Sequence, residues 1–231
     1  MSEKGIVLWV DGVEGCGKTT TVKNTTTVLR KLFPKKKVLS FNFPNNDPLP
    51  IRDFVLSREN DNGDLFAHTA SILATIEKYI LPEIDAGNII VCDRSILTMC
   101  TLQLHGEVDA IQSVLKLLGT SEIWTQCMSV SHYFLLIAPA EVIHNRLTSR
   151  GILNVRDNLS ITDIIVQSVN FQKAVSAIID ADVVQRRIEV ISEPTSIASQ
   201  DRLVEVVNNR FLENTLYNRL RYIWYKMGRS K

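Results

Sequence analysis

The chain has 231 residues, of which 45% are hydrophobic and 22% charged, so it is long enough for one domain with a sizeable core and too apolar for a disordered chain. Lys and Arg number 26 against 25 Asp and Glu, and a net charge of +1 lacks the basic excess of a dedicated nucleic-acid binder. The longest clean apolar run, 133–138, is far below the roughly 20 residues of a membrane span. With no secretory signal pattern at the N-terminus, we expect a cytosolic protein.

Short apolar runs alternate with longer segments of helical periodicity, which is the pattern of βαβ units around a parallel sheet. The first strand, 6–10, leads through a glycine-rich loop into a helix over 18–32 that Pro34 ends. Gly87 directly follows another helix, as expected of a C-terminal cap. In chain order, the remaining strands are predicted over 38–43, 89–92, 132–137 and 188–191, and the remaining helices over 51–56, 65–86, 97–105, 140–149, 161–179 and 197–211.

A single domain is predicted for residues 1–213, because no repeat, low-complexity segment or flexible linker divides them. A polar break near 150–160 interrupts the helical pattern, and a basic, aromatic tail occupies 214–231. The four cysteines form no C-x-x-C pair and have no histidine at metal-ligand spacing, so buried free thiols are expected. They are Cys16, Cys92, Cys100 and Cys127.

The loop after the first strand carries the strongest motif. Residues 12–19, GVEGCGKT, form a complete G-x-x-x-x-G-K-[ST] between a predicted strand and a predicted helix. Such glycines let consecutive backbone N–H groups turn toward a phosphate, and the helix N-terminus adds its dipole. The fold class is therefore a three-layer α/β/α P-loop NTPase fold with a five-stranded parallel sheet. The phosphates of a nucleotide are expected at Gly12, Gly15, Cys16, Gly17, Lys18, Thr19 and Thr20.

Two residues of this motif have expected roles toward the triphosphate. Lys18 is expected to reach the β- and γ-phosphates, and the Thr19 hydroxyl is expected to bind Mg²⁺. The competing dinucleotide fingerprint, G-x-G-x-x-G, fails because no third glycine follows Gly17. Asp93 ends an apolar run and is expected near this loop, where it would also assist Mg²⁺.

Residues 10–20, VDGVEGCGKTT, resemble the E-G-x-[ED]-x-x-G-K-[ST]-T loop of thymidylate kinases, with Asp11 where Glu is usual. Residues 93–103, DRSILTMCTLQ, are similar to the family pattern D-R-Y-x-x-S-x-x-A-Y-Q, and Phe43-Pro44 is similar to its Phe-Pro turn. These kinases lie within the larger group of nucleoside-monophosphate and deoxynucleoside kinases. The resemblance covers about residues 5–210 and is most specific at the P-loop and the Asp-Arg segment.

The resemblance implies ATP- and Mg²⁺-dependent phosphorylation of a deoxynucleoside monophosphate, in the first place dTMP to dTDP, by a homodimer. Arg94 would clamp the acceptor phosphate with its forked donors, and Glu14 would contact the sugar 3′-hydroxyl. Because the P-loop contains no Arg, the catalytic cations besides Lys18 and Arg94 would come from the lid, as Arg150 and Arg156. The implied substrate-binding residues are Glu14, Phe43, Arg52, Phe66, Arg94, Thr98 and Gln103.

Departures from the family pattern leave the acceptor open. Ala70 stands where the family has its base-reading Arg, and Ser95 replaces the family Tyr in the manner of deoxynucleoside kinases. Asn46 occupies a position where some relatives have a phosphate-binding Arg, and Arg52 is expected to substitute for it. The alternative is a kinase of deoxynucleosides or of modified pyrimidine nucleotides.

The C-terminal tail suggests an alternative function that is not enzymatic phosphorylation of a nucleotide. Residues 214–231 carry five basic and four aromatic side chains, with no acidic residue among them. Such a segment fits a terminal helix docked on the core, and it also fits a platform that binds single-stranded nucleic acid. In the second case the chain would be an ATP-binding, nucleic-acid-associated module.

Overall fold

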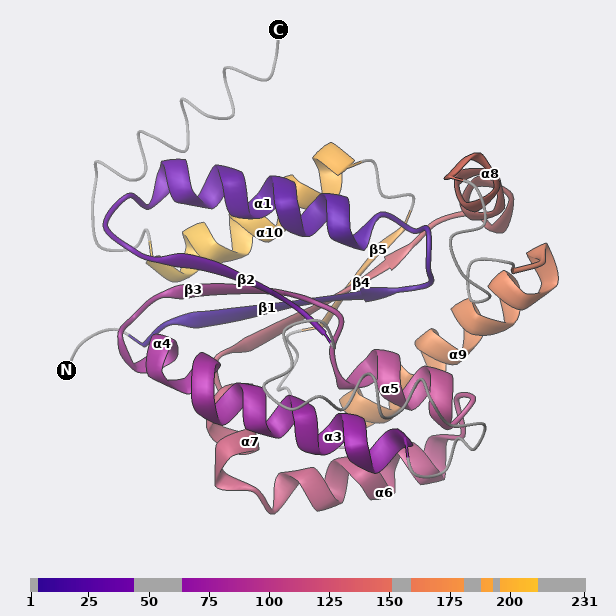
Figure 1. Cartoon of the computed structure of the whole chain (residues 1–231), viewed down its shortest axis with the longest axis horizontal. Coiled ribbons are helices and arrows are strands. Elements are labelled where there is room, and N and C mark those ends of the chain that lie inside the picture. The colour runs from indigo at the N-terminus through magenta and orange to yellow at the C-terminus, as the bar shows by residue number, and fades with distance from the viewer. Residues whose placement is uncertain (1–3, 44–63, 151–158, 181–187, 193–195, 212–231) are drawn as a thin grey trace, which may run out of the picture.

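The structure is a computed structural model that describes residues 4–43, 64–150, 159–180, 188–192 and 196–211. Its strands form one parallel sheet in the order β2-β3-β1-β4-β5. Helices pack on both faces of this sheet (Figure 1), so the predicted three-layer fold with five parallel strands is confirmed. The strands are β1 (Ile6–Gly12), β2 (Val38–Asn42), β3 (Ile89–Asp93), β4 (Ser131–Ile137) and β5 (Ile188–Ser192).

The central strands are buried because helices cover both of their faces. Every residue of β1 and β3 is buried, which explains why the sequence shows continuous apolar runs there rather than alternation. Trp9 of β1 stacks on Tyr133 of β4, with ring centroids 6.0 Å apart. Its indole N–H donates a 2.9 Å hydrogen bond to the hydroxyl of Ser131. These contacts fix the sheet whose ends support the site.

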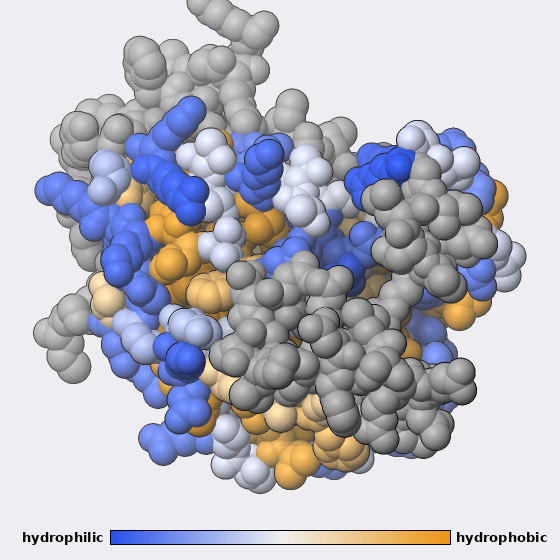
Figure 2. Space-filling model, viewed as in Figure 1, coloured by the Kyte–Doolittle hydropathy of each residue, from blue (hydrophilic) through white to orange (hydrophobic). Residues whose placement is uncertain are grey.

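On one face lie α1 (Lys18–Leu32) and α10 (Ser196–Phe211), and on the other lie α3 (Asp64–Thr75), α5 (Ile96–Gln103), α6 (Val108–Gly119) and α7 (Glu122–Met128) (Figure 1). α8 (Ala140–Arg150) lies beyond the carboxyl ends of β1 and β4, and α9 (Ile161–Asp180) packs on α5, α6 and α8. Figure 2 shows hydrophilic side chains over α1 and α8 and apolar ones between α1 and α3. In the described part of the chain, no helix has the length and apolar character needed to cross a membrane.

The predicted helix over 65–86 is not one regular helix. It is divided into α3, a π-helical turn η2 (Ile76–Ile80) and α4 (Leu81–Asp85). Pro82 lies at the start of α4, where its missing N–H and its ring disturb the regular i to i−4 bonding of the preceding turn. Gly87 follows with a φ of +77°, and its N–H donates to the carbonyl of Ile84, so the predicted glycine cap is confirmed.

Two helices, α6 and α7, were not predicted. α6 buries Ile111, Leu115 and Leu118, which are spaced as one face of a helix. α7 begins after Ser121, whose hydroxyl accepts a hydrogen bond from the backbone N–H of Trp124. The apolar spacing of α6 and the capping serine of α7 are both visible in the sequence. The two helices together occupy the interval between α5 and β4.

The boundaries of the other predicted elements lie within two residues of the observed ones, and α1 matches its prediction. The predicted helix over 51–56, Asn46 and the tail over 214–231 lie outside the described residues, as does most of the predicted lid. All four cysteines are buried and free, as expected.

Candidate active site

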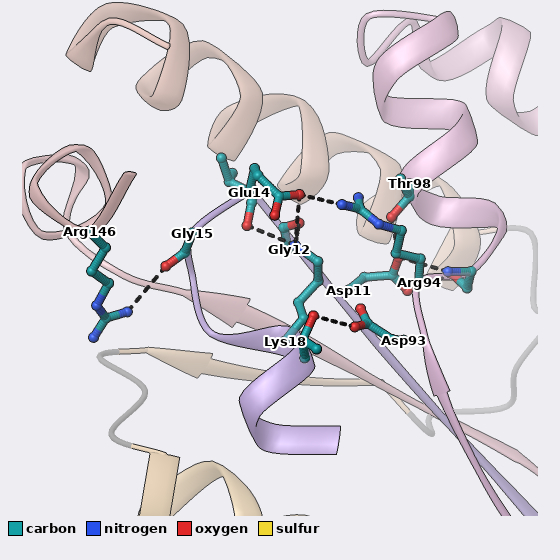
Figure 3. Close-up of polar contacts among 12 residues, drawn as sticks. Asp11, Gly12, Glu14, Gly15, Lys18, Asp93, Arg94, Thr98 and Arg146 are labelled. Carbon is teal, nitrogen blue, oxygen red and sulfur yellow. Dashed lines mark hydrogen bonds and ion pairs between the residues drawn. The ribbon is translucent and has the colours of Figure 1, made fainter. Parts of the chain in front are cut away.

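Strand pairing brings the two main motifs together. Val10 of β1 is the register partner of Asp93 of β3, so both strands end at the same edge of the sheet. β1 continues there into the loop over 12–17, and β3 continues into Arg94. This edge, the carboxyl ends of parallel strands, is where α/β proteins bind ligands. Figure 3 shows the two segments facing each other.

The loop depends on glycine at two crowded positions. Gly12 has a φ of +144°, and a Cβ there would lie 2.5 Å from the carbonyl oxygen of Leu136. Gly15 has a φ of +82°, and its Cβ would meet the side chain of Leu147 on α8 at 3.1 Å. Side chains at these positions would therefore push the loop away from β4 and α8. The loop shape is set by its packing as well as by its ligand chemistry.

Lys18 is folded back onto the loop. Its ammonium group donates 2.9 Å hydrogen bonds to the backbone carbonyls of Gly12 and Val13. It also lies 4.0 Å from the carboxylate of Glu14. The side chain is almost fully buried, and a buried cation requires such acceptors. The charge is thus held in the position from which it can contact a phosphate in the loop.

Thr19 and Asp93 lie in direct contact. The Thr19 hydroxyl donates a 2.6 Å hydrogen bond to Oδ2 of Asp93. Oδ1 of the same carboxylate is buried and has no hydrogen-bond partner among the described residues. An orphaned carboxylate oxygen beside a hydroxyl fits a hydrated Mg²⁺, which takes oxygen ligands and keeps several of its waters. Among the described residues there is no cluster of three His, Cys, Asp or Glu that could hold a metal.

Glu14 and Arg94 form an ion pair across the mouth of the loop, from Oε2 of Glu14 to Nη2 of Arg94. Both side chains keep partial solvent access, at 34% and 24% exposure. Burial pushes the pKa of Glu14 upward, but the charges of Lys18 and Arg94 outweigh burial, and the pKa lies below its usual value. Glu14 is therefore an anion at neutral pH, and Arg94 is directed at it (Figure 3).

Arg94 has a left-handed backbone, with a φ of +77°. Its N–H donates a 2.9 Å hydrogen bond to the carbonyl of Val10. The next residue, Ser95, begins α5 as its N-cap and also bonds to the buried carboxylate of Asp11. A non-glycine residue with positive φ costs about 1–2 kcal/mol, and such residues concentrate at functional sites.

A second arginine reaches the loop from α8. Nη1 of Arg146 donates to the backbone carbonyls of Gly15 and Cys16, each at 3.4 Å (Figure 3). Sequence reasoning named other lid cations and missed this contact, because the motif spacing does not show which Arg of α8 faces the loop. Arg150, one of the predicted cations, is exposed at the end of α8, and its charge contributes to the lowered pKa of Glu14.

The remaining residues predicted to bind substrate differ in how far their side chains are exposed. Phe43 is 1% exposed and packs against Trp9, and Thr98 is also 1% exposed and donates a hydrogen bond to Asp11. Both are placed in the core beneath the site. Phe66 on α3 is 65% exposed, and Gln103 is partly buried at the end of α5.

Of the other predicted site residues, Thr20 and Cys16 are described by the structure, whereas Arg52 and Arg156 are not. Thr20 is exposed and Cys16 is buried, both at the junction of the loop and α1. Burial raises the pKa of the Cys16 thiol, so this cysteine is protonated at neutral pH. Arg52 and Arg156 lie outside the described residues.

Comparison with known proteins agrees with this geometry. The family model described as thymidylate kinase matches residues 10–175, which is more than half of the chain and spans both motifs. The chain belongs to the thymidylate kinase family. Members of this family that are similar to it include thymidylate kinase from Mesomycoplasma hyopneumoniae, 29% identical over 121 residues. Thymidylate kinase from Enterococcus faecalis is 30% identical over 97 residues.

These sequence matches are partial. They cover 47% of this chain and 56% of the Mesomycoplasma hyopneumoniae protein, and 39% of this chain and 45% of the Enterococcus faecalis protein. The chain thus spans about half the length of the relatives it matches. The structural similarity covers more of the chain than these sequence matches do. The crystal structure of thymidylate kinase from Ehrlichia chaffeensis matches 88% of this chain and 99% of its own, with a TM-score of 0.62 and 16% sequence identity.

The left-handed backbone at residue 94 predicts an unusual order of stabilities. Arg94→Gly should be more stable to urea than Arg94→Ala by about 1 kcal/mol, because glycine adopts positive φ without the clash of a Cβ. Both variants lose the guanidinium, so the difference reports on the backbone alone. At Lys116, exposed within α6, the order should reverse, with the Ala variant more stable. An Arg94→Ala variant more stable than Arg94→Gly, as expected at Lys116, would show that residue 94 is unstrained.

Proposed function

We propose that the protein transfers the γ-phosphoryl group of ATP to a deoxynucleoside monophosphate, with dTMP as acceptor, yielding dTDP and ADP. The supporting observation is the Glu14–Arg94 pair at the edge of the loop that contains Lys18. A P-loop alone indicates a nucleotide triphosphate. A guanidinium on the neighbouring strand end, facing a loop carboxylate, supplies the means to hold a second phosphorylated reactant.

On the donor side, the backbone N–H groups of the loop and the Lys18 ammonium would surround the β- and γ-phosphates of ATP. Lys18 would then exchange the carbonyls of Gly12 and Val13 for phosphate oxygens. Thr19 and Asp93 would hold Mg²⁺, which supplies positive charge that neutralises the phosphates during transfer.

On the acceptor side, Arg94 would exchange the Glu14 carboxylate for the acceptor phosphate, whose oxygens match the forked donors of a guanidinium. Glu14 would then accept a hydrogen bond from the sugar hydroxyl. The acceptor oxygen attacks the γ-phosphorus in line, the bond to the ADP oxygen breaks, and no covalent enzyme intermediate is needed. The residues contribute by positioning the reactants and by stabilising charge.

Further positive charge comes from α8. Arg146 already contacts the loop, and Arg150 ends the same helix at the start of the predicted lid. We propose that one or both neutralise charge on the transferring group, together with Arg156 of the lid. The homodimer and a nucleic-acid role for residues 214–231 remain predictions.

A second candidate function follows from two residues. Ser95 stands at the acceptor side, where the family has Tyr, and its hydroxyl is fully used by Asp11 and the start of α5. Ala70 on α3 is exposed and carries no group that reads a base. A deoxynucleoside or a modified pyrimidine nucleotide is the alternative acceptor.

An acceptor panel decides between the two functions. We expect ADP release that saturates with dTMP and is at least about tenfold slower with thymidine at equal concentration, because thymidine lacks the phosphate that Arg94 would bind. Other pyrimidine monophosphates, including 5-modified ones, complete the panel. Saturable activity on thymidine with none on dTMP would reject the proposed function, and the absence of activity on every acceptor would reject both.

Variants of the two cations should separate the donor site from the acceptor site. Lys18→Ala should lose both ATP binding and turnover. Arg94→Ala should lower kcat/KM by about 10²–10³-fold and leave the ATP dissociation constant nearly unchanged, because the guanidinium serves the acceptor. ATP binding is measured by calorimetry and turnover by ADP release. Unchanged turnover in Arg94→Ala would remove this residue from the acceptor site.

The carboxylate of Asp93 should set the Mg²⁺ requirement. Asp93→Asn keeps the shape of the side chain but replaces one carboxylate oxygen with an amide NH₂, so the Mg²⁺ concentration for half-maximal activity should rise by about 10–100-fold. Titration of MgCl₂ at fixed ATP measures this change. Asp109→Asn, at an exposed position in the first turn of α6, is the matched control and should leave the titration unchanged. A wild-type Mg²⁺ curve for Asp93→Asn would contradict the assignment.

A further inference from the structure

The buried carboxylate of Asp11 lies directly beneath the site and has no role in the reaction described above. It is fully buried at the end of β1. Its Oδ1 accepts hydrogen bonds from the backbone N–H of Ser95 at 3.0 Å and from the hydroxyl of Thr98 at 2.7 Å. Its Oδ2 accepts from the hydroxyl of Ser95 at 2.6 Å. Three donors from one segment thus converge on one side chain.

These bonds enclose Arg94 from both sides. The N–H of Arg94 itself donates to the carbonyl of Val10, and the N–H of the following residue donates to Asp11. The two peptide groups that flank Arg94 are therefore tied to two successive residues of β1. Between these ties lies a φ of +77°, a conformation that arginine avoids without outside support.

The start of α5 belongs to the same unit. The hydroxyl of Ser95 donates to Asp11 and accepts from the backbone N–H of Leu97, so it caps α5 while anchored to β1. The Thr98 hydroxyl adds a second link one turn later. Residue 94 is thus clamped between the strand that carries the P-loop and a helix fixed to that strand. Figure 3 shows the guanidinium leaving this clamp toward Glu14.

The alternative interpretation is a polar cluster that only stabilises the fold. Burial raises the pKa of Asp11, and the hydrogen bonds from Ser95 and Thr98 oppose that rise. Satisfied clusters of this kind do stabilise folded proteins. A purely stabilising cluster, however, has no reason to enclose the strained residue that carries the guanidinium of the site.

We propose that Asp11 is a positioning residue, whose carboxylate holds the backbone of Arg94 in its left-handed conformation and so aims the guanidinium at the phosphate of the acceptor. The assignment of the acceptor rests on the function proposed above. The role of Asp11 toward the backbone and the Glu14–Arg94 pair is independent of it. What the role requires is hydrogen-bond acceptors at Asp11, rather than negative charge.

This requirement makes Asn the rescuing substitution. The carbonyl oxygen of an Asn at position 11 can accept from the backbone N–H of Ser95 and from Thr98, while its NH₂ can donate to the Ser95 hydroxyl. Asp11→Ala removes every acceptor. Comparing the two variants separates loss of the clamp from loss of charge.

The kinetic test compares Asp11→Ala, Asp11→Asn and Ser131→Ala. Ser131 is buried and accepts a hydrogen bond from the indole of Trp9 in the middle of β1, so its variant controls for the loss of a buried hydrogen bond to the same strand. Asp11→Ala should raise the acceptor KM by about tenfold and leave the ATP KM within about twofold, whereas Asn should restore most of the acceptor KM. An equal rise in both KM values, or failure of Asn to rescue, would overturn the proposal.

Two further variants keep the test decisive. In the Arg94→Ala background, Asp11→Ala should add no further rise in acceptor KM, because its effect passes through the guanidinium; an additive rise would contradict the proposal. Should Asp11→Ala not fold, Thr98→Val removes a single donor and should give a smaller rise in acceptor KM with an unchanged ATP KM. A wild-type acceptor KM in that variant would likewise overturn the role.

A crystal structure of the free variant separates this inference from the proposed function. In Asp11→Ala, or in Thr98→Val if the first does not fold, residue 94 should leave positive φ or lose its pair with Glu14. Retention of both would refute the positioning role, whatever reaction the protein catalyses. If the structure changes as expected but the wild-type protein phosphorylates no monophosphate, the proposed function fails and the positioning of Arg94 stands.

Discussion

The site depends on the register of two adjacent strands. Because β1 and β3 pair in parallel with Val10 opposite Asp93, the phosphate loop and the Asp93-Arg94 segment leave the sheet side by side. The contacts between the loop and the Asp93-Arg94 segment follow from that juxtaposition: the bond from Thr19 to Asp93 and the pair of Glu14 with Arg94. A slip of one residue would turn every side chain of the strand to the opposite face. The buried central strands make such a slip costly.

Cationic side chains outnumber the carboxylate of the loop. Lys18, Arg94 and Arg150 surround a single loop carboxylate, Glu14, and together they outweigh the effect of burial on its pKa. The loop carbonyls are bound by Lys18 on one side and by Arg146 on the other. These cations thus already lie against the loop, where the phosphates of two reactants would bring negative charge.

The sequence predicts those parts of the structure that depend on local patterns. The sheet, the P-loop and the strand-end location of Asp93 and Arg94 follow from apolar runs and a contiguous motif. The π turn before Pro82 was missed because periodicity alone does not show how a proline is accommodated. The Asp11 cluster joins residues 84 and 87 positions apart, and Arg146 reaches across about 130. No local pattern contains such pairs.

The folded-back position of Lys18 has a consequence for how a nucleotide enters. The Lys18 ammonium is already hydrogen-bonded to the carbonyls of Gly12 and Val13. A phosphate that binds there would therefore replace these carbonyls as the partners of the ammonium, and it would not have to order an unstructured loop. The conformational entropy of shaping the loop is then lost during folding rather than during binding. Affinity should accordingly depend on the exchange of one set of oxygens for another, and recognition can be fast as well as selective.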